Sequence, residues 1–288
     1  PLRRSRSITA IHDLCFEAVP EMVDDDNGRF LRREVSRAAV RSDRVTALTE
    51  TMADEIAAQY AIDRAKVVVV GCAADRTRFY RRSEREVAEV AARHGIFGPY
   101  VLAVGNIEPR KNQVRLVEAF AALPDDLADR FTLVLVGAGA WKDDAVREAA
   151  DAALAAGRRI RILAGTVEDA DVPALYSGAT ASAYVSVYEG FGMPPLESMA
   201  CRTPVVASEA SVIPEVVGDA AILVDPFDVA SIAAGLERAL RLEGAERDAL
   251  VEAGLANVAR YDWADHARTL LATIDDVRGA SAAGGTAR

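Results

Sequence analysis

Short apolar segments rich in β-branched residues alternate along this chain with longer segments whose apolar residues recur at helical spacing. This alternation is typical of parallel strands joined by crossover helices, so it predicts an α/β protein. The apolar segments predict strands at residues 7–11, 44–48, 66–70, 100–104, 132–136, 159–163, 181–186, 204–207 and 221–224. The helical spacing predicts helices between them, among these 29–39, 50–60 and 81–94.

The predicted strands fall into two groups, which indicates two domains. The first three strands make only a partial Rossmann-like domain, whereas the next six are enough for a complete doubly wound sheet. The glycines and the proline of residues 95–99 mark a boundary. We therefore expect an N-terminal domain at 1–95 and a C-terminal domain at 96–260. A last helix at 261–278 is expected to pack back toward the N-terminal domain, and 279–288 is expected to be a disordered tail.

Composition and charge narrow the class of protein. A chain of 288 residues with 51% hydrophobic residues can fill the cores of two domains. The formal net charge of −10 argues against an extended nucleic-acid surface, which would need an excess of Lys and Arg. The three cysteines lack metal-ligand spacing, and their odd number suits a reducing compartment. We therefore expect a cytoplasmic protein without a nucleic-acid partner.

The chain has no apolar run of the roughly 18 residues that would suggest a membrane-spanning helix. Its basic start, with Arg3, Arg4 and Arg6, has two interpretations. One is contact with the inner face of a membrane, and the other is a solvated chain end.

The most informative segment is Tyr188-Glu189-Gly190-Phe191-Gly192-Met193-Pro194-Pro195-Leu196-Glu197, which follows a predicted buried strand and opens a helix. Ligands of doubly wound sheets bind at this end of the strands. Gly190 and Gly192 allow the backbone to approach a ligand closely, and the free amides of a first helical turn favour an anion. Glu189 in the loop and Glu197 about one turn into the helix can both accept hydrogen bonds from the hydroxyls of one ligand. A turn followed by an exposed helix face is the alternative interpretation.

These residues resemble the E-x(7)-E signature of retaining glycosyltransferase family 4, whose members have the GT-B fold. Residues 104–112 are similar to the family's first strand-to-helix loop, and residues 204–208 and 214–219 are similar to its closing strand and helix. The resemblance covers about residues 8–277. The sequence departs from the family at Arg202, where Gly is usual, and at 71–75, where an Asn-Gly-Val-Asp turn is usual.

The resemblance implies an enzyme that transfers a hexose, with retention of configuration, from GDP-mannose or a related UDP- or dTDP-sugar. The acceptor would be a glycan, a lipid-linked sugar or a small molecule, as in polysaccharide biosynthesis. Residues 1–95 would form the acceptor side and residues 96–260 would bind the donor. No cofactor is expected, because the nucleotide sugar is a substrate. No metal is expected either, because the sequence has no Asp-x-Asp at a predicted strand end, and Asp24-Asp25-Asp26 falls in a polar loop before a helix.

The departing nucleoside diphosphate develops negative charge, which a fixed cation stabilises more in the transition state than in the ground state. Lys111 is the first candidate for this cation, and Arg110 is the second because its planar fork can take two phosphate oxygens. Ordinary solvated charge is the alternative for both. By the resemblance, Glu189 would hold sugar hydroxyls and Glu197 the ribose. The backbone amides along the sugar and phosphate would come from Gly190, Phe191, Gly192 and Met193.

Residues 11–14 end a predicted strand and resemble the family's His-Asp turn, whose histidine faces the reacting sugar across the cleft. We therefore expect His12 in the site, with capping of the next turn by its ring as the alternative. His94 and His266 lie in charged, helical surroundings and receive no functional role. Thr49 is expected to be a helix N-cap.

Three strands make at most half of a doubly wound domain, so the resemblance implies that the first part of the N-terminal domain is absent from this chain. That portion would lie on another chain or have been removed, or the natural protein would be short. A donor-binding but inactive fragment or subunit is therefore one alternative function. A sugar-nucleotide epimerase or hydrolase of the same architecture is another, which the E-x(7)-E spacing disfavours.

Overall fold

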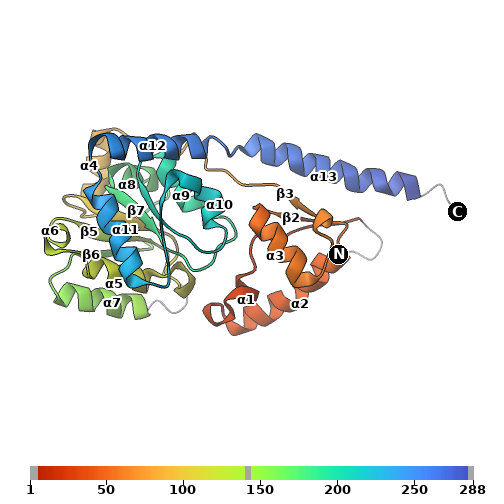
Figure 1. The fold of residues 1–288 in the computed structure, drawn as a ribbon, viewed down its shortest axis with the longest axis horizontal. Coiled ribbons are helices and arrows are strands. Elements are labelled where there is room, and N and C mark those ends of the chain that lie inside the picture. Colours follow the sequence, from red (N-terminus) through yellow and green to blue (C-terminus); the bar gives the residue numbers. More distant parts are fainter. Residues whose placement is uncertain (1–5, 140–143, 285–288) are drawn as a thin grey trace. The chain divides into compact units, whose positions relative to one another are not determined.

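The computed structural model describes residues 6–139 and 144–284 (Figure 1). Its contacts divide the chain into two compact units. Unit 1 consists of Pro1–Ala73, Tyr188–Phe191 and Tyr261–Arg288, and unit 2 consists of Ala74–Val187 and Gly192–Arg260. Each unit contains its own parallel sheet, so the predicted α/β class with two Rossmann-like parts is confirmed.

Unit 1 has a three-stranded parallel sheet in the order β1-β2-β3, with β1 at Ile8–Ala10, β2 at Arg44–Ala47 and β3 at Val67–Val69. Helix α1 (Cys15–Ala18), helix α2 (Asp25–Arg41) and helix α3 (Glu50–Tyr60) follow the first two strands. Helix α3 begins where Thr49 Oγ1 accepts a hydrogen bond from the amide of Met52 at 3.1 Å, which confirms the predicted N-cap. Asp25 and Asp26 lie in the first turn of α2 rather than in a loop, where acidic side chains favour the helix dipole.

The long helix α13 (Trp263–Gly284) also belongs to unit 1. Asp276 of this helix pairs with Arg44 at 2.7 Å, and Nδ1 of His266 lies 2.9 Å from the carbonyl oxygen of Gly71. The helix continues to Gly284, so the disordered tail expected from residue 279 is wrong as far as the structure describes the chain. Alanine has the highest helix propensity, and the alanines after Gly279 extend a helix that is already formed. Residues 285–288 lie outside the described residues.

Unit 2 has a six-stranded parallel sheet in the order β6-β5-β4-β7-β8-β9. The strands are β4 (Tyr100–Val104), β5 (Thr132–Gly137), β6 (Ile160–Ala164), β7 (Ala181–Tyr184), β8 (Val205–Ser208) and β9 (Ile222–Val224). Every strand was predicted from its apolar run within a few residues. The chain runs outward from β4 in one direction and then returns to β7 on its other side, so the switch point lies between these two strands.

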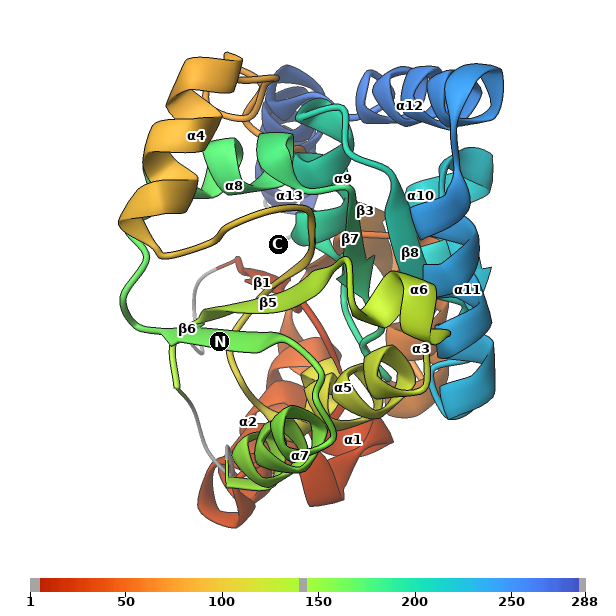
Figure 2. The same ribbon diagram turned by 90° about the vertical axis from the view of Figure 1, so that its left-hand side faces the viewer.

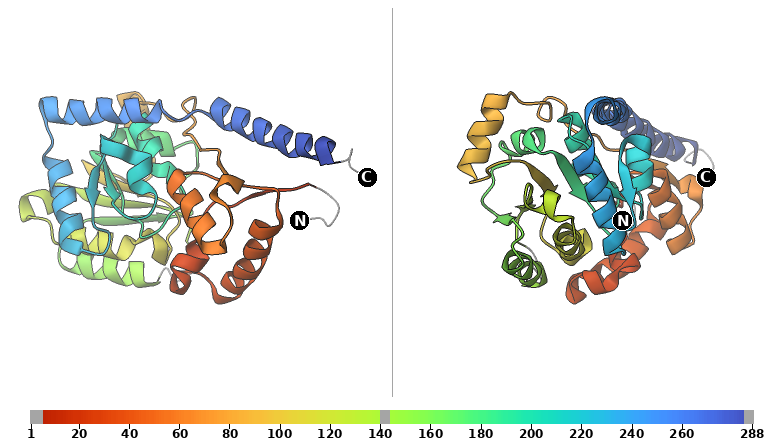
Figure 3. Two further views of the ribbon diagram at one scale, coloured as in Figure 1. Left: turned by 45° about the vertical axis from the view of Figure 1, so that its right-hand side comes forward. Right: turned by 60° about the vertical axis from the view of Figure 1, so that its left-hand side comes forward.

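Helices cover both faces of the unit 2 sheet, as can be followed in Figure 2. One face packs with α5 (Gln113–Ala121), α7 (Asp144–Ala155) and α11 (Val229–Arg241) in a core around Phe120, Leu133 and Leu236. The remaining helices of unit 2 are α4 (Glu84–Arg93), α6 (Asp125–Ala128), α8 (Val172–Gly178), α9 (Met193–Ala200), α10 (Ile213–Val217) and α12 (Gly244–Val258). Among these, α8 packs against α4 and α9, and α12 packs against α9; the further views in Figure 3 show the same layers.

The division between the units differs from the boundary that the sequence predicts at residues 95 and 96. The structure places α4 in unit 2, because this helix packs against α8. Val90 of α4 is buried, and a Cβ atom added to Gly178 would lie 2.5 Å from Cγ1 of Val87. The glycine-rich turn at 95–99 therefore follows a helix of unit 2 instead of separating two units.

Candidate active site

The signature segment connects β7 to α9 at the carboxyl edge of the unit 2 sheet. Gly192 precedes α9 in the left-handed region, with φ of 97°, which disfavours residues that carry a Cβ atom. An added Cβ atom would also lie 2.6 Å from Cδ1 of Ile213. Met193 begins the helix, and Pro194 and Pro195 follow in its first turn. The N-cap residue of α9 is Gly192, which has no side chain to cap this end of the helix.

The four residues Tyr188–Phe191 group with unit 1, while Val187 and Gly192 on either side group with unit 2. Gly190 lies so close to the backbone of His12 that an added Cβ atom would be 1.7 Å from the His12 carbonyl oxygen. Glycine at this position is therefore required by packing inside unit 1. Glu189 is buried, and Phe191 packs edge-on against Tyr261 at 5.5 Å between ring centroids. Phe191 thus has a packing role through its ring.

His12 is exposed and comes directly after the buried Ile11 at the carboxyl end of β1. Its ring forms no hydrogen bond with any residue that the structure describes. The next turn is capped instead by Asp13, whose Oδ1 accepts a hydrogen bond from the amide of Cys15 at 3.0 Å. The structure therefore does not support a capping role for the His12 ring, and it brings His12 next to Gly190.

Tyr188 anchors the same segment from its other end. Its buried hydroxyl donates a hydrogen bond to Oε2 of Glu55 on α3 at 2.6 Å. Burial raises the pKa of Tyr188 far above its usual range, and the hydrogen bond to Glu55 raises it further. The phenol therefore keeps its proton at neutral pH and remains a hydrogen-bond donor. Nothing in the local sequence distinguishes Tyr188 from a core residue, because a tyrosine that follows a predicted buried strand is typical of a protein interior.

Glu197 lies in α9, one turn after Met193, where the sequence predicted it. It is half-buried, and this burial raises the pKa of its carboxyl group to about 7. The positive charge of Arg78 lowers the pKa, and the negative charge of Asp169 raises it. Arg78 also donates a hydrogen bond to the carbonyl oxygen of Asp169 at 2.6 Å. The ionised form of Glu197 is therefore unfavourable unless a ligand donates hydrogen bonds to its carboxylate.

Lys111 ends a short 3-10 turn, η3 (Pro109–Lys111), immediately before α5. Its Nζ donates a hydrogen bond to the hydroxyl of Tyr184 at 3.0 Å and lies 5.1 Å from the centre of the Tyr184 ring. Tyr184 is buried at the carboxyl end of β7, directly before the signature segment. The ammonium group is thus held at the switch point of the unit 2 sheet. Tyr184 is a second residue that sequence reasoning missed.

Arg110 forms an ion pair with Glu108, with Nη2 2.8 Å from Oε1. This carboxylate neutralises part of the charge of Arg110. The backbone of Arg110 also holds the signature segment, because its carbonyl oxygen accepts a hydrogen bond from the amide of Val187 at 3.0 Å.

Asn112 joins three loops at this edge of the sheet. It takes the left-handed conformation at φ of 62°, and its buried Nδ2 donates hydrogen bonds to the carbonyl oxygens of Val185 at 3.0 Å and Pro226 at 2.7 Å. These bonds satisfy backbone groups of loops that are distant in sequence, so Asn112 shapes the site without facing a ligand itself. Only the tertiary contacts reveal this role.

A pocket of about 360 Å³ lies at the carboxyl ends of β4, β5 and β6. Its lining combines Gly105, Gly137 and Gly165 with Asp169 and with aliphatic side chains such as Leu163. Asp169, which lines this pocket, also raises the pKa of Glu197 through its negative charge.

Within the described residues there is no cluster of three or more His, Cys, Asp or Glu side chains that could hold a metal ion. Among the helices that the structure describes, none combines the length and the apolar character needed to cross a membrane.

Comparisons with known proteins identify the family to which this chain belongs. A family model described as "Glycosyl transferases group 1" matches residues 91–256. The O-antigen chain mannosyltransferase B of Escherichia coli is 33% identical over 266 residues, which cover 91% of this chain and 68% of that protein. The D-inositol 3-phosphate glycosyltransferase of Salinispora tropica is 36% identical over 250 residues, which cover 82% of this chain and 51% of that protein. The chain therefore spans about half to two thirds of these two relatives.

Among solved structures, Anabaena HepE in complex with UDP and glucose superimposes with a TM-score of 0.80 at 22% identity, covering 95% of this chain and 72% of that one. At this identity the likeness shows the fold alone, which is the two-domain GT-B fold. Fold, family model and relatives together define a glycosyltransferase. The chain belongs to the glycosyltransferase group 1 family.

Proposed function

We propose that this chain binds a nucleotide sugar and transfers its hexose with retention of configuration and without a divalent metal. GDP-mannose is the leading donor, and related UDP- and dTDP-sugars are the alternatives. The observation that carries the proposal is that Lys111 is held against Tyr184 at the switch point of unit 2, whose next loop leads through Gly192 into α9 and Glu197. Relatives described as mannosyltransferases support mannose as the sugar.

The proposed roles follow from charge and hydrogen-bonding capacity. Lys111 stabilises the diphosphate as it leaves, with Arg110 as a second cation, and the amides of Gly190, Phe191, Gly192 and Met193 contact sugar and phosphate. Glu197 accepts hydrogen bonds from the ribose diol. Glu189 accepts hydrogen bonds from hydroxyls of the transferred sugar, and His12 lies at the reacting sugar.

In the proposed reaction the bond between the anomeric carbon and the diphosphate oxygen breaks, and an acceptor oxygen bonds to the same face of that carbon. The leaving diphosphate takes the proton of the acceptor hydroxyl, so neither glutamate is required as a nucleophile. The electron pair of the broken bond goes to the diphosphate, beside which Lys111 lies. Lys111 thus acts where the charge develops.

We propose a glycan or a lipid-linked sugar as the acceptor, in polysaccharide biosynthesis at the cytoplasmic face of a membrane. The support is that two relatives are described as O-antigen chain mannosyltransferases. A donor-binding subunit that needs a separate N-terminal piece is the second candidate. The observation that motivates it is the three-stranded sheet of unit 1, which is half the size of the six-stranded sheet of unit 2.

Calorimetric titration of the chain with GDP-mannose, UDP-glucose and a dTDP-sugar, followed by transfer assays on glycan and lipid-linked acceptors, separates these functions. Binding with transfer is the expected result. Binding without transfer, restored by a separately supplied N-terminal piece, would establish the subunit. Donor hydrolysis that no acceptor redirects would indicate a hydrolase, and failure of all three nucleotide sugars to bind would refute the proposal.

A further inference from the structure

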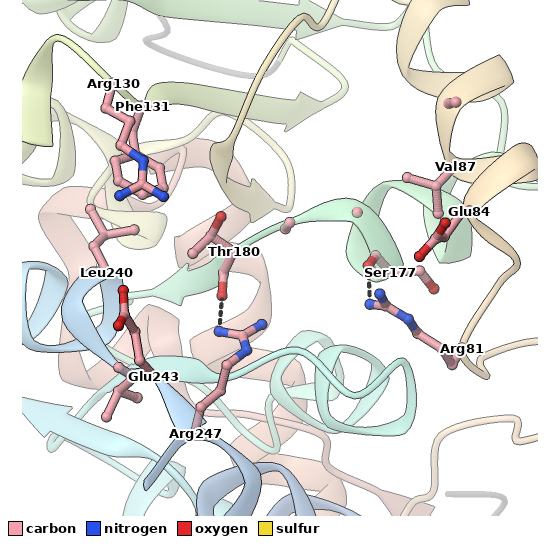
Figure 4. A pocket seen from close by; sticks show the side chains of 14 residues that line it. Arg81, Glu84, Val87, Arg130, Phe131, Ser177, Thr180, Leu240, Glu243 and Arg247 are labelled. Atoms are coloured by element: carbon pink, nitrogen blue, oxygen red, sulfur yellow. Dashed lines mark hydrogen bonds between the residues drawn. The ribbon is translucent and has the colours of Figure 1, made fainter. Parts of the chain in front are cut away.

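A second pocket, of about 440 Å³, lies at the amino edge of the unit 2 sheet (Figure 4). Its walls include the residues before β5, the turn between α8 and β7, and the start of α12. The candidate active site lies at the carboxyl edge, beyond Tyr184. Because a strand rises about 3.3 Å per residue, the passage from Thr180 to Val185 separates the two sites by roughly 16 Å. This pocket is therefore distinct from the donor site.

Three arginines from separate parts of the chain line this pocket: Arg81 before α4, Arg130 before β5, and Arg247 in α12. Arg247 donates a hydrogen bond to the carbonyl oxygen of Thr180 at 2.9 Å, and Arg81 donates one to the carbonyl oxygen of Ser177. Figure 4 shows both bonds. A guanidinium group carries five N–H donors, so these bonds orient the two groups without saturating them.

None of the three arginines forms an ion pair with any carboxylate in the described part of the chain. Glu84 and Glu243 also line the pocket but remain outside ion-pair distance of them, and the lining carries one positive charge in excess. Arg247 is half-buried, and its pKa is lowered first by burial and then by the charge of Arg81, which Asp248 only partly offsets. The positive charge of Arg81 acts unfavourably on this half-buried cation in the same pocket, and an anion bound there offsets part of that cost.

The remaining walls are apolar and include Phe131, Leu240 and Leu242. We propose that this pocket binds a phosphate monoester, with the phosphate among the arginines and the organic part against these apolar side chains. Guanidinium forks that approach from different elements suit the tetrahedral oxygens of a phosphate better than the single plane of a carboxylate. Its ligand is then an effector rather than the donor, and this inference does not depend on the proposed function.

The experiment uses phenyl phosphate as the probe, titrated calorimetrically with the donor site occupied by saturating GDP or UDP. We expect one site per chain and at least tenfold weaker binding in Arg247→Gln and in Arg130→Gln, because each loses a charge-assisted hydrogen bond. Arg238→Gln is the matched control, since this exposed arginine lies on α11 outside the pocket. It should leave the affinity unchanged.

The melting temperature, measured on the same samples, should be equal in all variants and shows that each is folded. If Arg247→Gln fails to fold, the affinity of Arg130→Gln for phenyl phosphate tests the proposal, because Arg130 is exposed and its substitution is not expected to disturb the fold. Absence of saturable phenyl phosphate binding would overturn the proposal. So would equal affinity in the wild type and both pocket variants, or equally tight binding of phenyl sulfate.

Discussion

Lys111 Nζ lies 3.0 Å from the hydroxyl oxygen of Tyr184 and within 5.1 Å of the centre of its ring. The contact joins the first strand-to-helix loop of unit 2 to the strand that leads into the signature segment, 73 residues later in the chain. An ammonium group held in this way need not reorganise when charge develops on a leaving group. The first two predictions follow from it.

Lys111→Ala should reduce turnover about 100-fold to 1,000-fold while donor affinity changes much less, because the lost charge acts on the departing diphosphate. The melting temperature should change little, since this side chain lies at a loop end. Steady-state kinetics and donor titration measure the two effects. Arg110→Ala is the control, and its loss should be smaller because Glu108 already pairs with Arg110. Near-normal turnover in a folded Lys111→Ala protein would leave Arg110 as the candidate cation.

Tyr184→Phe keeps the aromatic face under Lys111 and removes only the hydroxyl group. We expect about a tenfold lower turnover and a melting temperature lower by a few degrees, because one hydrogen bond to a charged group contributes about 1.5–3 kcal/mol. In the Lys111→Ala background the same change should have no further effect on turnover, because the two residues act together. Additive losses in this double-mutant cycle would show that Tyr184 acts without Lys111.

The pKa of Glu197 predicts how stability depends on pH. Its pKa is about 7 in the folded protein and 4.5 as a free side chain. Between these values the folded state holds a proton that the unfolded state has lost, so this group makes the protein less stable as pH rises from 4.5 to 7. Glu197→Gln should remove this dependence and be more stable than the wild type at pH 8. Urea unfolding from pH 4.5 to 8 tests it, and parallel curves for the two proteins would contradict it.

The two signature glutamates should differ in ligand dependence. If Glu197 holds the ribose, Glu197→Ala should weaken free nucleoside diphosphate and full donor alike. If Glu189 holds the transferred sugar, Glu189→Ala should weaken only the full donor. Calorimetry with both ligands measures this, and similar losses of both ligands in both variants would mean that the roles are wrongly assigned.

Treatment with EDTA should leave transfer activity unchanged, because Lys111 and the amides at the start of α9 are proposed to balance the diphosphate charge. Activity is measured before and after chelation, and again after addition of Mg²⁺ or Mn²⁺. Loss on chelation followed by recovery with either metal would refute metal-independent transfer.

Much of the fold could be predicted because parallel strands buried on both faces are continuous apolar runs. Val101–Leu102 and Leu133–Leu135 are such runs, and both lie in the sheet as expected. Helix α4 shows where prediction from the sequence fails, because the sequence places the domain boundary after this helix and the structure places the helix in unit 2. Its charged sequence conceals the contact with α8, since which face of an amphipathic helix finds a partner depends on the rest of the fold.

For the candidate site, the sequence by itself determined that Glu197 lies in a helix, that Lys111 lies in a strand-to-helix loop and that a glycine precedes α9. Local patterns of apolar residues, glycine and proline mark where strands and helices begin and end. Only the tertiary structure decided which side chains support them. Tyr184 reaches Lys111 across 73 residues, and Asn112 reaches Val185 across the same interval. Such contacts depend on the order of strands in the sheet, in which β4 lies beside β7, and no local pattern encodes that neighbour. The raised pKa of Glu197 has the same origin, because burial is a property of the assembled fold.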